Sequence, residues 1–424
     1  MKRAVVLSGG GSRGAYQVGV WRALRKLKID YDIVTGTSIG AINALMMVQN
    51  EFAKTYWLWS NITFDSIYDT PFPQKYDTFN DISVIYKKYF KQFLESGGVN
   101  TEKVGLFIDR IFNERKFFKS KTDYGLVTFN LSTFKPVMMT KEKLRGENIR
   151  AYVLASATCY PAFQKTIINN EQYIDGGYYD NLPINLAVEL GATEIIAVDL
   201  TTIGIAKKVK KDIKITYIKP RNKIGSFLVF DKLLARKAMQ YGYNDAMKTY
   251  KKLDGNKYTF KHDHLRVNYN YYKESFLNEC HEIFKYNAQN KSIYDDILKL
   301  SILNKVINSD NDSSIKKIIN DSIEYLGKLY ELDDSKIYSI HKYHKLLKKG
   351  LEESESISIK YIEEKIQKKQ FRKLMNSKTI IKYIYNLINV DKFTPSTRKK
   401  LLTVAFVFPK DFISAIYMLV INKN

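Results

Sequence analysis

The sequence predicts an α/β fold with a largely parallel sheet, followed by a mostly helical domain. Short apolar strands alternate with helical stretches through about the first 250 residues, which is the pattern of such a sheet. Glycine is frequent in this half, whereas beyond Gly255 only Gly327 and Gly350 remain. The later composition turns to Lys, Ile, Tyr, Leu, Glu and Asn with helical periodicity. We therefore expect two domains, residues 1–254 and 255–424.

Length and cysteine content restrict the class of protein. A chain of 424 residues with 45% hydrophobic residues can bury more than one core. Cys159 and Cys280 form neither a metal-ligand spacing nor a disulfide framework, which is typical of a reducing compartment. The apolar run after Met1 is too short for a signal peptide, and the sequence has no uninterrupted apolar stretch of about 18 residues. We expect a cytoplasmic protein that makes peripheral contact with an anionic membrane.

The chain is strongly basic, with a formal net charge of +24. Such a charge favours nucleic acid, an anionic membrane surface or an acidic protein as a partner, and genome composition is an equally good explanation of the lysine content. One basic run lies between two expected strands, at Lys207, Lys208, Lys210, Lys211, Lys214, Lys219, Arg221 and Lys223. It is either a solvated loop or a patch that faces anionic headgroups.

The first expected strand, residues 4–7, leads into the glycine-rich loop Gly9-Gly10-Gly11-Ser12-Arg13-Gly14 and then a helix over residues 15–28. This loop contains G-x-G-x-x-G, which indicates either a dinucleotide site or another anion site at a helix N-terminus. A dinucleotide site requires a carboxylate at the end of the second strand, and residues 31–35 end without one. The backbone N–H groups could instead bind an oxyanion. Arg13 adds a positive charge there or forms a structural ion pair.

The second strand runs into Gly36-Thr37-Ser38-Ile39-Gly40, after which an apolar helix begins. A G-x-S-x-G sequence between strand and helix is the nucleophile elbow, in which Ser38 takes an unfavourable backbone conformation that exposes its hydroxyl. A glycine-rich turn that merely contains serine would look the same. The strand–turn–helix context favours a nucleophile at Ser38.

The remaining elements of this half follow in order. Residues 51–115 predict an insertion of helices and loops, whose aromatic residues belong to the core or line an acyl-chain cleft. Paired strands are expected at 126–129 and 136–139, a small-residue helix at 151–158, further strands at 172–174, 194–199 and 213–218, and a long helix at 230–250. Asp175-Gly176-Gly177 follows one of these strands and reads as a common turn or as a functional motif.

All five histidines lie beyond the expected domain boundary, at His262, His264, His281, His341 and His344. An ordinary Ser-His-Asp triad therefore cannot form within the first domain. Either the helical domain supplies a histidine or a carboxylate accepts the Ser38 proton, which requires a dry site that raises the carboxylate pKa. Asp175 is the best placed carboxylate, and Asp180 and Asp199 are weaker candidates.

The glycine-rich loop, the elbow and the Asp-Gly-Gly sequence together resemble the patatin-like phospholipase family over about residues 3–250. The resemblance implies a three-layer α/β/α fold and a lipid acyl hydrolase of the phospholipase A or lysophospholipase type. It implies Ser38 as nucleophile, Asp175 as general base and the backbone of Gly10, Gly11, Ser12 and Arg13 as oxyanion hole. Residues 155–161 are similar to the family's small-residue segment, with Cys159-Tyr160 before Pro161 as a departure. The helical half has no counterpart in it.

These patterns lead to a lipid ester as the expected substrate, with no metal, no cofactor and no nucleic acid expected. An acyltransferase on the same scaffold is the first alternative, and a nucleotide-binding protein or a basic binding module with an inactive site is less favoured. The apolar segments 401–408 and 412–421 are expected to be buried, against the α/β domain, or to anchor at a lipid interface. The oligomeric state and the lipid headgroup are not predicted.

Overall fold

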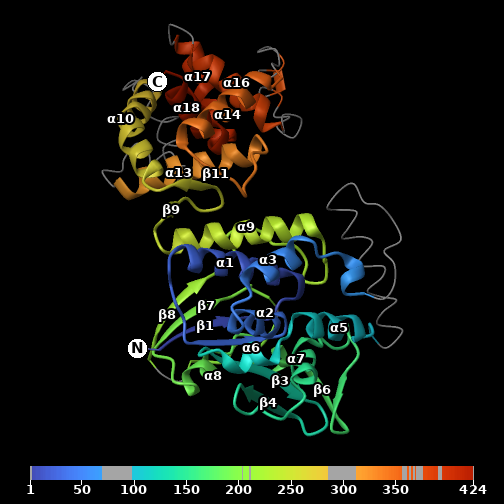
Figure 1. Ribbon diagram of the computed structural model, residues 1–424. Coiled ribbons are helices and arrows are strands. Elements are labelled where there is room, and N and C mark those ends of the chain that lie inside the picture. Colours follow the sequence, from blue (N-terminus) through green and yellow to red (C-terminus); the bar gives the residue numbers. More distant parts are fainter. Residues whose placement is uncertain are drawn as a thin grey trace. The chain divides into compact units, whose positions relative to one another are not determined.

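The computed structural model describes residues 2–68, 98–202, 204–209, 212–284, 312–355, 376–389 and 394–423, with 361, 364, 365 and 368 (Figure 1). Contacts within the chain divide it into two compact units, Met1–Tyr250 and Lys251–Asn424. The aromatic residues Phe72, Phe79 and Tyr86 of the expected insertion lie outside the described residues. Each unit is described by itself.

The first unit is built on a sheet of eight strands in the order β5-β6-β3-β2-β1-β7-β8, with β4 paired to β3. Its strands are β1 (Arg3–Leu7), β2 (Ile33–Thr37), β3 (Asp123–Asn130), β4 (Lys135–Thr140), β5 (Thr166–Ile168), β6 (Glu171–Asp175), β7 (Glu194–Val198) and β8 (Lys214–Ile218). The pairs among β1, β2, β3, β7 and β8 are parallel. The sequence predicted all of these strands except β5, and β2 begins and ends two residues later than expected.

One edge of the sheet is antiparallel, where a largely parallel sheet was expected. Strands β4 and β6 both pair with β3 in antiparallel register, and β5 pairs with β6 in the same way. The connections 131–134 and 169–170 are too short for the crossover that a parallel pair needs. This edge carries Asp175 at the end of β6.

Helices cover both faces of the sheet, which gives the three-layer α/β/α arrangement. Helix α8 (Ile184–Glu189) packs on one face against alternate residues of the central strands, including Ala4 and Val6 of β1. The opposite face contacts α2 (Ile39–Val48) and α7 (Ile149–Ala157), and the buried Tyr124 hydroxyl of β3 donates to the Ala41 carbonyl. Because both faces are covered, the central strands are apolar along nearly their whole length.

Further helices complete the first unit. Helix α9 (Lys232–Thr249) lies beside α1 (Gly14–Lys26) and α3 (Phe52–Ser60) (Figure 1). The others are α5 (Glu102–Ile111), α6 (Glu114–Lys119) and the single turns η1 (Gly11–Arg13), η2 (Phe64–Ser66) and η3 (Gly176–Tyr178). Helix α1 begins directly after the glycine-rich loop and α2 directly after Ser38, so two helix N-termini open at the carboxyl edge of the sheet.

The second unit is mostly helical. Its helices are α10 (His264–Phe284), α13 (Asp312–Leu329), α14 (Ile340–Glu353), α16 (Ser377–Ile388), α17 (Pro395–Val407) and α18 (Pro409–Lys423). A small sheet joins β9 (Leu253–Asp254), β10 (Thr259–Lys261) and β11 (Ile337–Tyr338). No helix among the described residues is both long and apolar enough to cross a bilayer.

Helix α18 forms the centre of the second unit. Every residue from Asp411 to Ile421 is buried, and the helix packs against α10, α13, α14, α16 and α17. The expected burial of residues 412–421 is therefore confirmed, and these side chains belong to the core of the helical unit itself. A helix that is buried on all sides needs apolar residues around its whole circumference.

Candidate active site

Ser38 occupies the turn between β2 and α2. Its φ of 57° and ψ of −130° confirm the unfavourable conformation expected of a nucleophile elbow. A Cβ on Gly36 would lie 2.3 Å from the Gly40 carbonyl carbon, and one on Gly40 would lie 2.4 Å from the Leu7 oxygen. The turn therefore requires both glycines, because no side chain could fit at either position.

A second serine supports the backbone of Ser38. The Ser38 N–H donates to Ser156 Oγ at 3.0 Å, and the Ser156 hydroxyl donates to the Val127 carbonyl at 2.7 Å. Ser156 is fully buried at the end of α7. Ser156 belongs to the small-residue segment of the sequence, but no local pattern indicates its contact with the elbow.

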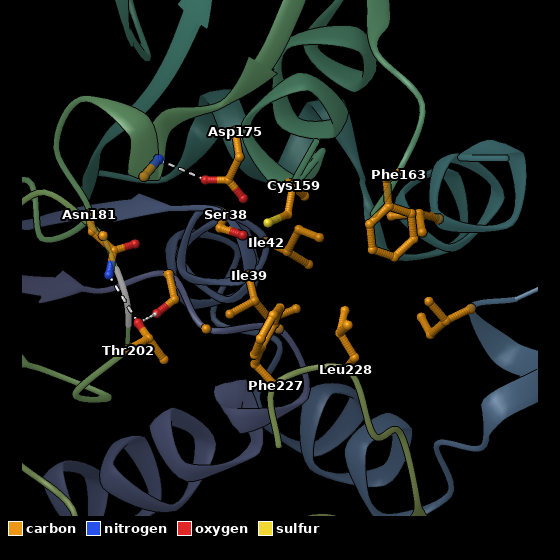
Figure 2. Close-up of a pocket in the computed structure, with 18 of the residues that line it drawn as sticks. Ser38, Ile39, Ile42, Cys159, Phe163, Asp175, Asn181, Thr202, Phe227 and Leu228 are labelled. Carbon is orange, nitrogen blue, oxygen red and sulfur yellow. Dashed lines mark hydrogen bonds between the residues drawn. The ribbon is translucent and has the colours of Figure 1, made fainter. Parts of the chain in front are cut away.

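Asp175 ends β6, and its side chain and that of Ser38 point toward one another (Figure 2). One carboxylate oxygen, Oδ1, accepts the N–H of Gly177 at 2.7 Å, and the Asp175 N–H donates to the Thr158 carbonyl at 2.9 Å. A Cβ on Gly176 would lie 2.1 Å from the Val127 oxygen. The glycine therefore lets the Asp-Gly-Gly turn approach β3 closely.

Burial raises the pKa of the Asp175 carboxyl to about 6, while hydrogen bonds from the Ser38 hydroxyl and the Gly177 N–H partly oppose this rise. The physical cause is desolvation, which disfavours the charged form of a carboxyl group. At neutral pH the group is still mostly ionised. It can therefore accept a proton, and it is a stronger base than an exposed aspartate.

The glycine-rich loop lies beside the elbow, and Gly9, Gly10 and Gly11 line the same cavity as Ser38. The Gly9 N–H donates to the Asn181 carbonyl at 3.1 Å. The Gly9 carbonyl accepts from Thr202 Oγ1 at 2.7 Å, and Asn181 Nδ2 donates to the same Thr202 oxygen at 3.0 Å (Figure 2). Asn181 and Thr202 thus position the loop, and no sequence pattern indicated a role for either residue.

The N–H groups of the loop differ in their partners. Ser12 N–H donates to the Phe227 carbonyl at 2.8 Å, and Arg13 N–H donates to the Gly10 carbonyl at 3.2 Å. Within the described part of the chain, the N–H groups of Gly10 and Gly11 have no acceptor. These two donors, beside Ser38, are free to bind a developing oxyanion.

Arg13 holds a neighbouring loop. Its Nε donates to the Gly225 carbonyl at 2.9 Å, the Ser12 hydroxyl donates to the Ser226 carbonyl at 2.8 Å, and burial lowers the pKa of the guanidinium. Arg13 does not line the cavity. Gly14 begins α1, where its carbonyl accepts from Asn43 Nδ2 at 3.0 Å.

The cavity at Ser38 has a volume of about 530 Å³ and a largely apolar wall. Figure 2 shows its side chains around the elbow. Its apolar side chains come from α2, α3, α5 and the segments around them, and they include Ile39, Ile42, Trp59, Ile62, Ile67, Val104, Phe107, Phe163, Phe227, Leu228 and Phe230. Such a site suits an elongated apolar ligand with one polar group at the Ser38 end.

The weaker candidate bases lie elsewhere. Neither Asp180 nor Asp199 is among the described residues that line the cavity. Asp180 accepts from the Leu182 N–H at 3.3 Å, and Asp199 forms an ion pair with Lys219 at 2.9 Å. No group of His, Cys, Asp or Glu side chains in the described residues is arranged to hold a metal ion.

Comparison with known proteins gives one family. The family model described as patatin-like phospholipase matches residues 5–188. The chain is 28% identical over 204 residues to mouse patatin-like phospholipase domain-containing protein 7, covering 46% of this chain and 13% of that protein. It is 28% identical over 210 residues to lysophospholipase nte1 of Aspergillus terreus (strain NIH 2624 / FGSC A1156), covering 47% and 12%.

The shared region is thus a small part of these relatives, about an eighth of their length. Among solved structures, that of VipD from Legionella pneumophila is similar at 15% identity and a TM-score of 0.39, covering 99% of this chain and 90% of the other. A likeness of that size establishes neither fold nor function. The family model and the curated relatives agree, and residues 5–188 of the chain match the patatin-like phospholipase family.

Proposed function

We propose that the chain is a lipid acyl hydrolase of the phospholipase A or lysophospholipase type, with Ser38 as nucleophile and Asp175 as general base. The observation that carries the proposal is the pair itself. A serine in the elbow conformation faces a buried carboxylate of raised pKa inside an apolar cavity. The family match and the relative named as a lysophospholipase support the same chemistry.

In the first step, Asp175 accepts the hydroxyl proton while Ser38 Oγ attacks the ester carbonyl carbon. The carbonyl oxygen becomes an oxyanion, which the N–H groups of Gly10 and Gly11 and the N-terminus of α2 stabilise. The C–O bond then breaks, the alcohol leaves with the proton from Asp175, and the acyl group stays on Ser38.

In the second step, water attacks the acyl-enzyme. Asp175 accepts a proton from that water, the same N–H groups bind the second oxyanion, and the fatty acid leaves as Ser38 recovers its proton. The apolar wall holds the acyl chain throughout, and it excludes water from the carboxylate, which maintains the raised pKa.

The test is fatty acid release from phospholipids, lysophospholipids and neutral glycerides by the full chain, beside Ser38→Ala and Asp175→Asn. We expect each variant to lose at least about 10³-fold in kcat with the fold retained, because each removes a participant in the proton transfer. Full activity in folded Asp175→Asn protein would refute the pair. Product analysis with added alcohol acceptors separates hydrolysis from acyl transfer.

A further inference from the structure

Three exposed side chains lie in the cavity wall or directly beside it. Tyr178 and Ile205 line the cavity and are also 45% and 50% exposed. Tyr160, 36% exposed, accepts a hydrogen bond from the Tyr178 hydroxyl through its carbonyl oxygen. We call these three residues the rim.

The rim is fixed to the catalytic turn. The Ile205 N–H donates to the Gly177 carbonyl at 3.1 Å, and the Ile205 carbonyl accepts the Asn181 N–H at 2.7 Å. These two backbone hydrogen bonds join Ile205 to the last residue of the Asp-Gly-Gly turn and to Asn181, four residues later. The exposed Ile205 side chain is therefore held in the cavity wall rather than carried by an unsupported loop.

Lysines accompany the rim. The Lys207 ammonium lies 4.0 Å from the centre of the Tyr179 ring, and that of Lys165 lies 5.2 Å from the centre of the Tyr160 ring. Lys208 is exposed next to Lys207. In the described residues, none of these three lysines has a carboxylate within ion-pair distance.

The basic run of the sequence is thus divided by its partners. Lys214 pairs at 2.8 Å with Glu194, which it shares with Arg3, and Lys219 pairs with Asp199 at 2.9 Å. Lys207 and Lys208 form no ion pair within the described residues, although Lys207 interacts electrostatically with Asp180, and Lys210 and Lys211 lie outside the described residues. Lys207 and Lys208 therefore place positive charge next to Ile205, a residue of the cavity wall.

We propose that the rim, with Lys165, Lys207 and Lys208, is a docking surface for an anionic phospholipid bilayer. The proposal rests on the proposed function, since a lipid substrate would enter the cavity from that bilayer. Tyrosine rings suit the headgroup level, an exposed isoleucine inserts among acyl chains, and lysines bind anionic headgroups. A nucleic-acid site would use the lysines but would gain nothing from Ile205.

The test measures binding of the full chain with Ser38→Ala to vesicles of phosphatidylcholine alone or mixed with phosphatidylserine. Lys207→Gln with Lys208→Gln should weaken binding to the anionic vesicles about 25-fold, since each lysine at such a surface contributes about fivefold. Ile205→Ser should weaken binding to both kinds of vesicle about fivefold.

The matched control is Lys26→Gln with Lys28→Gln, which makes the same charge change at the far end of α1. The control should bind nearly as the parent does, and the Lys207/Lys208 variant with Ser38 intact should hydrolyse a soluble short-chain ester at the parent rate. Equal losses in control and test variants, or no loss in the test variant, would overturn the proposal.

Binding of the same variants to an oligonucleotide is measured as well. If the Lys207/Lys208 variant loses oligonucleotide binding but keeps vesicle binding, the surface is a nucleic-acid site and the proposal fails. Vesicle binding is measured in the Ser38→Ala variant and does not depend on catalysis. If the parent chain hydrolyses no ester, the proposed function fails, but the vesicle-binding result can still be interpreted.

Discussion

Ser38 and Asp175 approach one another across β3, a strand to which neither belongs. Thr37 of β2 pairs with Val127 of β3, and Asp175 of β6 pairs with the next residue of β3, Thr128. Ser38, which follows Thr37, and Asp175 therefore lie at the same level on either side of β3. With neighbouring strands about 4.8 Å apart, their backbones are about 10 Å apart, and the side chains reach inward above β3. The register of β3 on both sides therefore decides whether a proton can pass between them.

The pH dependence of hydrolysis should follow the Asp175 carboxyl. Its pKa of about 6 means that the base is ionised above that pH and protonated below it. We expect kcat/KM for a soluble ester to rise about tenfold per pH unit up to about pH 6 and then to level off. A stopped assay across pH 4–9 measures this, and a flat profile down to pH 4 would contradict a buried base.

Asp175→Asn should make the protein more stable at neutral pH while removing its activity. A raised carboxyl pKa contributes stability that is present below the unfolded value of 3.8 and is lost as pH rises through about 6. The amide keeps an acceptor for Gly177 and carries no buried charge. Because one pH unit corresponds to about 1.4 kcal/mol, the gain at pH 7 is at most about 3 kcal/mol.

Denaturant unfolding at pH 7 and pH 4 checks this prediction. The difference between variant and parent should shrink at pH 4, where the aspartate is largely neutral. A variant that is less stable than the parent at pH 7 would show that ionised Asp175 stabilises the fold.

Ser156→Ala should impair turnover more than its effect on stability explains. The change leaves the Ser38 N–H and the Val127 carbonyl without their partner, which costs about 1–3 kcal/mol of unfolding free energy. It also releases the strained turn, so we expect kcat to fall about tenfold or more with KM nearly unchanged.

Thr158→Val is the matched control, because Thr158 is an equally buried hydroxyl at the end of the same helix. Its side chain donates to the Leu154 carbonyl and does not contact the elbow. It should lose stability and keep kcat. Equal kcat losses in the two variants would assign Ser156 a structural role only.

Leu228→Trp should shift the preference toward short acyl chains. Leu228 lines the apolar wall and lies away from the catalytic pair (Figure 2). A larger side chain there shortens the space for a chain without touching the reacting atoms. The ratio of kcat/KM for long and short esters should fall about tenfold or more, whereas equal losses for both lengths would place the acyl chain elsewhere.

Local sequence patterns were sufficient for the main strands of the sheet, for the elbow at Ser38 and for the conformation it requires. Each of these depends on a few adjacent residues. The antiparallel direction of the strands at one edge of the sheet could not be predicted, because the pattern of apolar residues does not indicate strand direction. The support from Ser156, Asn181 and Thr202 joins segments that are more than 100 residues away from the groups they hold, and no local pattern records such contacts.

The helical unit shows the same limit. The apolar run 412–421 was expected to be buried, but its periodicity could not distinguish burial against another domain from burial at the centre of its own bundle. A helix with apolar residues around its whole circumference is predicted to be buried by other elements, but the pattern does not identify those elements. Which helices those neighbours are follows from packing.

The position of α18 also has a consequence for synthesis. Five other helices assemble around it, yet it is made after all of them. During synthesis, the inner faces of those helices stay uncovered until residue 421 has left the ribosomal exit tunnel. The core of the second unit is therefore completed only when α18 joins it, and until then the helices that pack against α18 expose apolar surface.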